Sequence, residues 1–147
     1  MLAKRVLKML NNPTESNCPC GSGTNFAECC QPYLAGIAIA PTAEKLMRSR
    51  YTAFSVGAVD YLIDTLAPER RSPGEAKMLA QELRSTEWVR LEILDTYEGG
   101  PLHQKGQVEF NAHFKAADGR AGVLHERSNF RRDGEKWIYV DGSVEVN

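Results

Sequence analysis

The chain has 147 residues, of which 42% are hydrophobic and 25% are charged, and its formal net charge is −1. This length and composition predict one globular core of modest size. A net charge so close to zero gives no broad attraction for nucleic acid or anionic lipid, and no apolar run approaches the twenty residues that a membrane span needs. We therefore expect neither a nucleic-acid partner nor a membrane partner.

The first segment, residues 1–12, contains apolar residues that Lys4, Arg5 and Lys8 interrupt. No small-residue cleavage site follows, so the segment does not fit a secretory signal peptide. We interpret it as a leader that is frayed or forms a short helix.

All four cysteines of the chain lie within thirteen residues, as Cys18, Cys20, Cys29 and Cys30. Such close neighbours form a disulfide only with strain, whereas two close pairs of thiolates suit a tetrahedral metal such as zinc. The intervening Gly21-Ser22-Gly23 allows the chain to turn back. Four thiolates leave no open metal position, so we expect a structural site. An iron centre would use the same ligands, and the spacing also allows free cysteines, a redox pair or disulfides between chains. Clustered metal-binding thiols suit the reducing cytoplasm.

Three helices are predicted after residue 41. Thr42 can cap a helix from Ala43 to about Val56, which Gly57 would end. A second helical pattern begins at Val59 and stops before Pro68. The run Ser72-Pro73-Gly74-Glu75 reads as a capping box that starts a third helix, which continues to about residue 83.

After Thr86 the hydrophobic period changes to two, which predicts strands. Inward-facing positions are expected at Val89, Leu91, Ile93 and, in the next strand, Val108, Phe110, Ala112 and Phe114. Asp-Gly turns at 118–119 and 133–134 lead to further strands over about 121–131 and 136–140. The order predicts an α+β fold in which three helices precede a curved, about four-stranded antiparallel sheet, with a small zinc-knuckle module in front.

The run from Cys18 through Gly23, with Phe26 and Cys29-Cys30, closely resembles the SEC-C zinc motif. That motif is best known at the carboxyl end of the bacterial translocase motor SecA, where it binds zinc and supports contact with the export chaperone SecB and the ribosome. The resemblance implies that Cys18, Cys20, Cys29 and Cys30 bind Zn²⁺. The loop has Thr24, Asn25, Ala27 and Glu28 where family members usually carry lysines, and the chain has no GxxxxGK nucleotide-binding loop.

Further strings resemble the bacterial YchJ-like family of SEC-C proteins. They include 46–54 (LMRSRYTAF), 125–130 (HERSNF) and 137–142 (WIYVDG). The resemblance implies a cone-shaped domain like nuclear transport factor 2 (NTF2). We therefore expect three segments: the leader at 1–12, a SEC-C zinc module at 13–36 and an NTF2-like domain at 37–147.

Two charged residues fall on faces that should be buried. Arg50 shares a helical face with Leu46 and Phe54, and Glu126 alternates with inward-facing Leu124 and Phe130. Because an isolated buried charge is costly, we expect Arg50 and Glu126 to form a structural ion pair. The alternative is a pocket in the cone, where Glu126 with Tyr51 or Tyr61 would serve a lyase or isomerase. We assign no catalytic residue.

Taken together, the sequence predicts a cytoplasmic zinc-binding protein whose module binds a protein partner, in export, translation or quality control as the SEC-C resemblance implies. We expect loss of zinc to unfold the module and to leave the NTF2-like domain folded. The sheet face is a candidate homodimer surface.

Overall fold

A computed structural model describes residues 17–147 of the chain, so the predicted leader at 1–12 lies outside the described residues. Within this part of the chain the elements follow the predicted order, with helices first and strands last. None of the helices in it combines the length and apolar composition needed to cross a bilayer.

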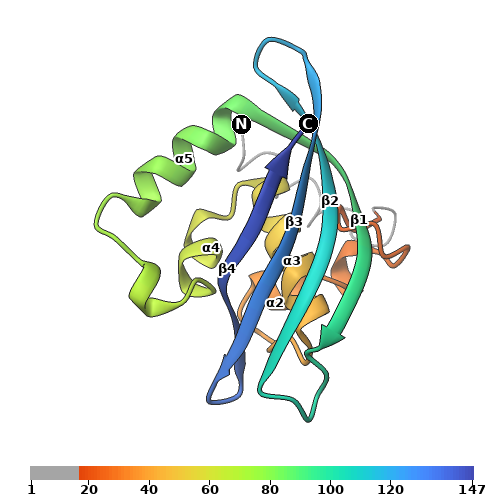
Figure 1. Ribbon diagram of the computed structural model, residues 1–147, viewed down its shortest axis with the longest axis vertical. Helices are drawn as coiled ribbons and strands as arrows, with labels where there is room; N and C mark the ends of the chain where they lie inside the picture. The colour runs from red at the N-terminus through yellow and green to blue at the C-terminus, as the bar shows by residue number, and fades with distance from the viewer. Residues whose placement is uncertain (1–16) are drawn as a thin grey trace.

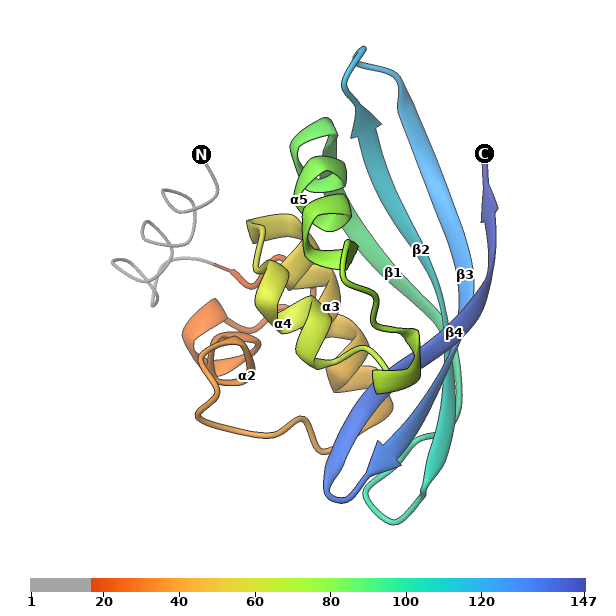
Figure 2. The same cartoon turned by 90° about the vertical axis from the view of Figure 1, so that its left-hand side faces the viewer.

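The four strands form one antiparallel meander in the order β1-β2-β3-β4. They are β1 (Thr86–Glu98), β2 (Lys105–Ala116), β3 (Ala121–Asp133) and β4 (Lys136–Val146). The sheet is curved, and the helices lie together on one of its faces (Figures 1 and 2). This arrangement confirms the predicted α+β class, with helices on one side of an open antiparallel sheet.

The long helix α3 (Ala43–Val56) packs against the inner face of the sheet. It begins and ends as predicted, because the Thr42 hydroxyl accepts a hydrogen bond from Lys45 N at 3.1 Å and Gly57 ends the helix at φ 82°. A shorter helix, α4 (Val59–Asp64), and a 3₁₀ turn, η2 (Pro68–Arg70), follow.

Helix α5 (Glu75–Ser85) departs from the predicted capping box. Gly74 occupies its N-cap position, and no side chain caps the first turn. The Ser72 hydroxyl lies instead 3.4 Å from the Glu75 carboxylate, so the predicted Ser72 cap is wrong.

Strand β1 does not keep the simple alternation predicted for it. The pairing with β2 shifts between Trp88 and Arg90 and again between Ile93 and Asp95. These two bulges each insert an unpaired residue, and they leave Val89 52% exposed while Leu91 stays buried. The prediction of Val89 as an inward residue is therefore wrong. The alternation predicted for β2 is confirmed by its buried Val108, Phe110 and Ala112.

Strand β4 extends six residues beyond the predicted end at Val140. Its second half pairs with β3, where Val144 lies opposite Glu126 and Val146 lies opposite Leu124. The Asp141-Gly142-Ser143 run has low strand propensity, so pairing with a neighbouring strand decides the local conformation there.

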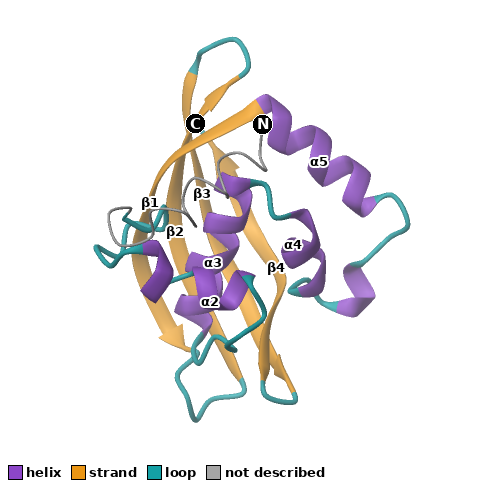
Figure 3. Ribbon diagram, turned by 180° about the vertical axis from the view of Figure 1, so that it is seen from behind, coloured by secondary structure: helices purple, strands orange, loops and turns teal. Residues whose placement is uncertain are grey.

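The cysteine segment has no separate core. Its buried Cys18, Cys20, Cys30 and Phe26 belong to the same hydrophobic cluster as the sheet and helix residues Leu46, Tyr51, Leu91, Phe110, Phe130 and Trp137. Its short elements are η1 (Phe26–Glu28) and α2 (Gln31–Leu34), and α2 packs against α3 (Figure 3). The cysteine segment and the α+β part therefore share one core.

Candidate metal centre

The first cysteine pair lies in a tight turn. Cys18 N donates to Thr24 O at 2.9 Å, and an isolated antiparallel bridge joins Asn17 to Asn25. Between these contacts Gly21 and Gly23 adopt φ values of 77° and 87°, which side chains rarely tolerate. The glycines therefore allow the reversal that the sequence predicted.

The second pair follows a capped turn. The Asn25 side chain accepts from Glu28 N at 3.1 Å and so starts η1, and Cys29 N donates to Phe26 O at 3.1 Å. Cys30 then precedes α2, and its carbonyl accepts from Leu34 N at 3.1 Å. These hydrogen bonds hold the backbone of Cys29 and Cys30 in place and so position both of their sulfur atoms.

The four sulfur atoms all lie within 4.8 Å of one another. The Sγ atoms of Cys20 and Cys29 are 3.6 Å apart, and those of Cys29 and Cys30 are 3.9 Å apart. A tetrahedral metal with sulfur ligands at about 2.3 Å requires sulfur–sulfur distances of about 3.8 Å. The four cysteines are therefore close enough together to hold a metal ion.

Hydrogen bonding among the cysteines shifts the pKa values of the three buried thiols in different directions. Hydrogen bonds from Cys18 and Cys30 lower the pKa of Cys20, whereas the bond with Cys20 raises the pKa of Cys18 to about 12. The bond with Cys18 likewise raises the pKa of Cys30. Four thiolates packed this closely would repel one another, so keeping all four deprotonated requires a cation between them.

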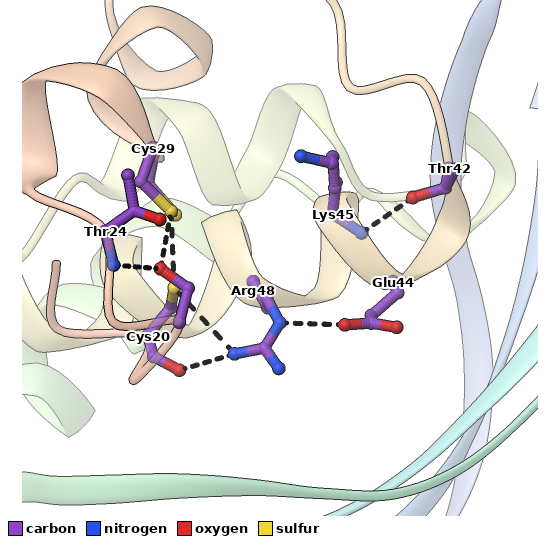
Figure 4. A network of polar contacts seen from close by, with 9 residues as sticks. Cys20, Thr24, Cys29, Thr42, Glu44, Lys45 and Arg48 are labelled. Atoms are coloured by element: carbon purple, nitrogen blue, oxygen red, sulfur yellow. Dashed lines mark hydrogen bonds and ion pairs between the residues drawn. The ribbon is translucent and has the colours of Figure 1, made fainter.

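Helix α3 supplies further contacts to the cluster. Arg48 Nη1 donates to Cys20 O at 2.9 Å and lies 4.0 Å from Cys20 Sγ, while Arg48 Nε donates to Glu44 at 2.9 Å (Figure 4). Farther along the helix, Thr52 Oγ1 lies 3.7 Å from Cys18 Sγ. Sequence reasoning did not identify Glu44, Arg48 or Thr52 as neighbours of the cysteines, although their spacing of four places them on one helical face.

Arg50 and Glu126 are both buried, but they do not form the predicted ion pair. Arg50 Nη1 donates to Leu62 O at 2.9 Å and to Thr65 Oγ1 at 2.6 Å. The Glu126 carboxylate accepts from Ser128 and Tyr139 hydroxyls at 2.6 and 2.7 Å. The Arg50 guanidinium lies over the Tyr139 ring, 4.8 Å from its centre.

The prediction of a direct pair is therefore wrong, because the Tyr139 side chain contacts both groups and each has local hydrogen-bond partners. Burial lowers the pKa of Arg50 to about 10, so the guanidinium remains charged at neutral pH. Neither tyrosine that the sequence paired with Glu126 donates to it: the Tyr61 hydroxyl lies 2.6 Å from Ser49, and Tyr51 is buried in the core. This geometry favours a structural role for Glu126.

The outer face of the sheet is polar. His113 lies 2.5 Å from Glu92, and His125 lies 2.7 Å from Glu109, which also pairs with Arg127. His113 therefore lies on the polar face of its strand, against the Glu92 carboxylate.

Comparison with known proteins identifies both segments. Residues 42–142 match the model of the YchJ middle, NTF2-like domain, and residues 16–32 match the SEC-C motif. A UPF0225 protein from Geobacter sulfurreducens is 42% identical over 85% of this chain and 77% of its own length. A UPF0225 protein from Corynebacterium glutamicum is 44% identical over 87% of this chain and 97% of its own.

Solved structures agree with these matches. The solution structure of a SEC-C motif containing protein from Rhodopseudomonas palustris has a TM-score of 0.79 and 36% identity, covering 86% of this chain and 97% of its own. The crystal structure of a SEC-C motif containing protein from Psychrobacter arcticus has a TM-score of 0.74 and 29% identity. The match covers 90% of this chain and 84% of the Psychrobacter chain. The chain belongs to the YchJ-like family, in which an NTF2-like domain follows a SEC-C motif.

Proposed function

We propose that Cys18, Cys20, Cys29 and Cys30 bind one Zn²⁺ as four thiolates, and that the resulting rigid segment binds a protein partner in the cytoplasm. The observation that carries the zinc assignment is the closeness of the four sulfurs, which all lie within 4.8 Å of one another, with two pairs at 3.6 and 3.9 Å, near the spacing of a tetrahedral site. When bound, the ion would stabilise the fold of the cysteine segment. It would not activate a water molecule, because four protein ligands leave no open coordination position.

The proposed partner surface includes the segment directly after the cysteines. Ile37 is 82% exposed and Ile39 is 48% exposed, and both follow α2 within a few residues. What selects these two residues among the exposed aliphatic side chains is their position directly after the segment that the metal would hold in place. The cytoplasm suits the proposal because its reducing conditions keep thiols available for metal.

A first experiment tests the metal and the partner together. The purified chain should contain about one zinc per molecule, and Cys30→Ser should contain much less. Affinity capture from a bacterial lysate should recover a partner with the native chain and lose it with Cys30→Ser. A partner that is retained after complete zinc loss would refute the proposed role of the metal.

A second experiment locates the surface. Ile37→Ser should weaken capture of that partner at least tenfold, because it removes an exposed apolar contact. Leu102→Ser is the matched control, since Leu102 is 93% exposed but lies in the turn between β1 and β2. Equal loss with both variants would place the contact elsewhere.

A further inference from the structure

The four sulfurs of the cluster differ in their access to solvent. Cys18, Cys20 and Cys30 are 4%, 0% and 1% exposed, whereas Cys29 is partly exposed. Cys29 and Cys30 both line an open cleft of about 280 Å³, together with Ser22, Thr24 and Lys45, and of these two cysteines only Cys29 is partly exposed to solvent. A peroxide molecule is comparable in size to two waters, each about 30 Å³, so it fits this cleft.

We propose that Cys29 is an oxidation site through which hydroperoxides disassemble the metal centre, an inference that rests on the proposed zinc binding. When zinc is bound, all four sulfurs are thiolates, so a difference in thiol pKa cannot determine which one reacts with peroxide first. Exposure to solvent then determines which sulfur is oxidised first. Cys29 meets that condition, and the three other sulfurs are buried.

Polar groups around Cys29 favour the reaction. Thr24 N donates to Ser22 Oγ at 3.2 Å, which leaves the Ser22 hydroxyl proton free to point toward Cys29 Sγ, also at 3.2 Å. The hydroxyl can then donate to the oxygen that leaves the peroxide. The cleft also holds two cations, Lys45 and Arg48, and two carboxylates, Glu28 and Glu44, so its charges balance and the Ser22 hydroxyl is the group that favours the reaction.

The chemistry proceeds in two balanced steps. The Cys29 sulfur attacks hydrogen peroxide, a sulfur–oxygen bond forms, the oxygen–oxygen bond breaks, and the departing hydroxide takes a proton to become water. The Cys20 sulfur, 3.6 Å away, then attacks the sulfenic sulfur, and a disulfide forms as a second hydroxide leaves and is protonated. The two sulfurs supply both electrons, and two ligands are lost from the centre.

Cys20 is the expected partner in the disulfide for a geometric reason. Cys30 is also near, with its sulfur 3.9 Å from that of Cys29, but a disulfide between adjacent residues is strained. Loss of Cys20 as a ligand would also disturb its contact with Arg48, which connects the cluster to α3.

The test uses the full chain loaded with zinc. Hydrogen peroxide is added, zinc release is followed with a chromogenic chelator, and sulfenic acid is trapped with dimedone and located by mass spectrometry. We expect early dimedone label on Cys29 and a Cys20–Cys29 disulfide at the end, which a thiol reductant with added zinc reverses. Early label on a buried cysteine, or label spread equally over all four, would overturn the proposal.

Two ligand-preserving variants sharpen the result, because histidine also binds zinc. Cys29→His should release zinc at least tenfold more slowly, whereas Cys20→His should keep fast labelling of Cys29 without the disulfide. A Cys29→His variant that releases zinc as fast as the native chain would refute the assignment. A native chain that binds no zinc would instead refute the proposed function, so the two failures are distinguishable.

Discussion

Replacing Arg48 by Met tests whether helix α3 and the cysteine cluster stabilise each other. The substitution removes the donor to Cys20 O and the ion pair with Glu44, and it keeps an unbranched apolar stem. A hydrogen bond from a charged donor contributes about 1.5–3 kcal/mol, and an i,i+4 ion pair adds about 0.3–0.5 kcal/mol. Because the Arg48 side chain is 22% exposed, the lower part of this range applies, and we expect a loss of about 2 kcal/mol.

This loss is measurable in two ways. For a chain of this size, 1 kcal/mol corresponds to about 2–4 °C in melting temperature, so Arg48→Met should lower the melting temperature by about 4–8 °C. Changes in groups that orient metal ligands typically weaken metal affinity by about 10–100-fold. A competition titration with a zinc chelator should therefore show weaker zinc binding.

The matched control is Lys45→Met on the same helix. Lys45 is exposed, and its backbone N–H bond to Thr42 does not depend on its side chain. Both variants remove one positive charge, but only Arg48→Met removes the contact with Cys20. Two results would refute the proposal that helix α3 and the cysteine cluster stabilise each other. One is an equal loss of stability and zinc affinity in both variants, and the other is a loss of stability in Arg48→Met that is the same with and without zinc.

Two further predictions concern the sheet. Gly142→Ala should destabilise the protein by about 1–3 kcal/mol in a denaturant titration, because the added methyl group would overlap the Glu126 carboxylate that two hydroxyls hold in place. Gly74→Ala, where nothing lies within 4 Å, is the control, and a similar loss in both would contradict the packing argument. Hydrogen bonds from Arg131 lower the pKa of Glu69 to about 2 from 4.5. The stability from this pair is therefore present above about pH 4.5 and is lost as pH falls toward 2. An NMR titration should give this pKa for Glu69, and Arg131→Gln should return it toward 4.5; an unchanged value in the variant would exclude Arg131 as the cause.

The sequence predicted features that depend on local chemistry. The Thr42 cap, the Gly57 end of α3 and the glycine turn between the cysteines all follow from single-residue conformational preferences. The clustering of the four cysteines in space could be predicted because they lie within thirteen residues of one another in the chain. The alternation of β2 was equally clear, since each inward position is apolar.

Features that depend on tertiary contacts were not predicted. The bulges that expose Val89 are set by pairing with β2, and the second half of β4 forms because β3 lies beside it. The predicted ion pair between Arg50 and Glu126 does not form because Tyr139, on β4, contacts both side chains. Its hydroxyl donates to the Glu126 carboxylate, and its ring lies under the Arg50 guanidinium. A charged residue on a face that should be buried predicts that the charge has an interaction partner in the fold. The sequence does not indicate which residue that partner is.

The shared core also changes an expectation about metal loss. The sequence predicted an NTF2-like domain that stays folded without zinc. Because Cys18, Cys20 and Cys30 pack in the same cluster as Leu46 and Leu91, we now expect chelation to destabilise the whole chain. Thermal unfolding should shift to lower temperature as one transition when zinc is removed.

Zinc-edge X-ray absorption on the purified chain tests the central claim most directly, because it reports the atoms bound to the metal. The cysteine geometry predicts one zinc per chain surrounded by four sulfur atoms at about 2.3 Å. A stoichiometric zinc with fewer than four sulfur ligands, or a chain that retains no zinc after purification in reducing buffer, would contradict it.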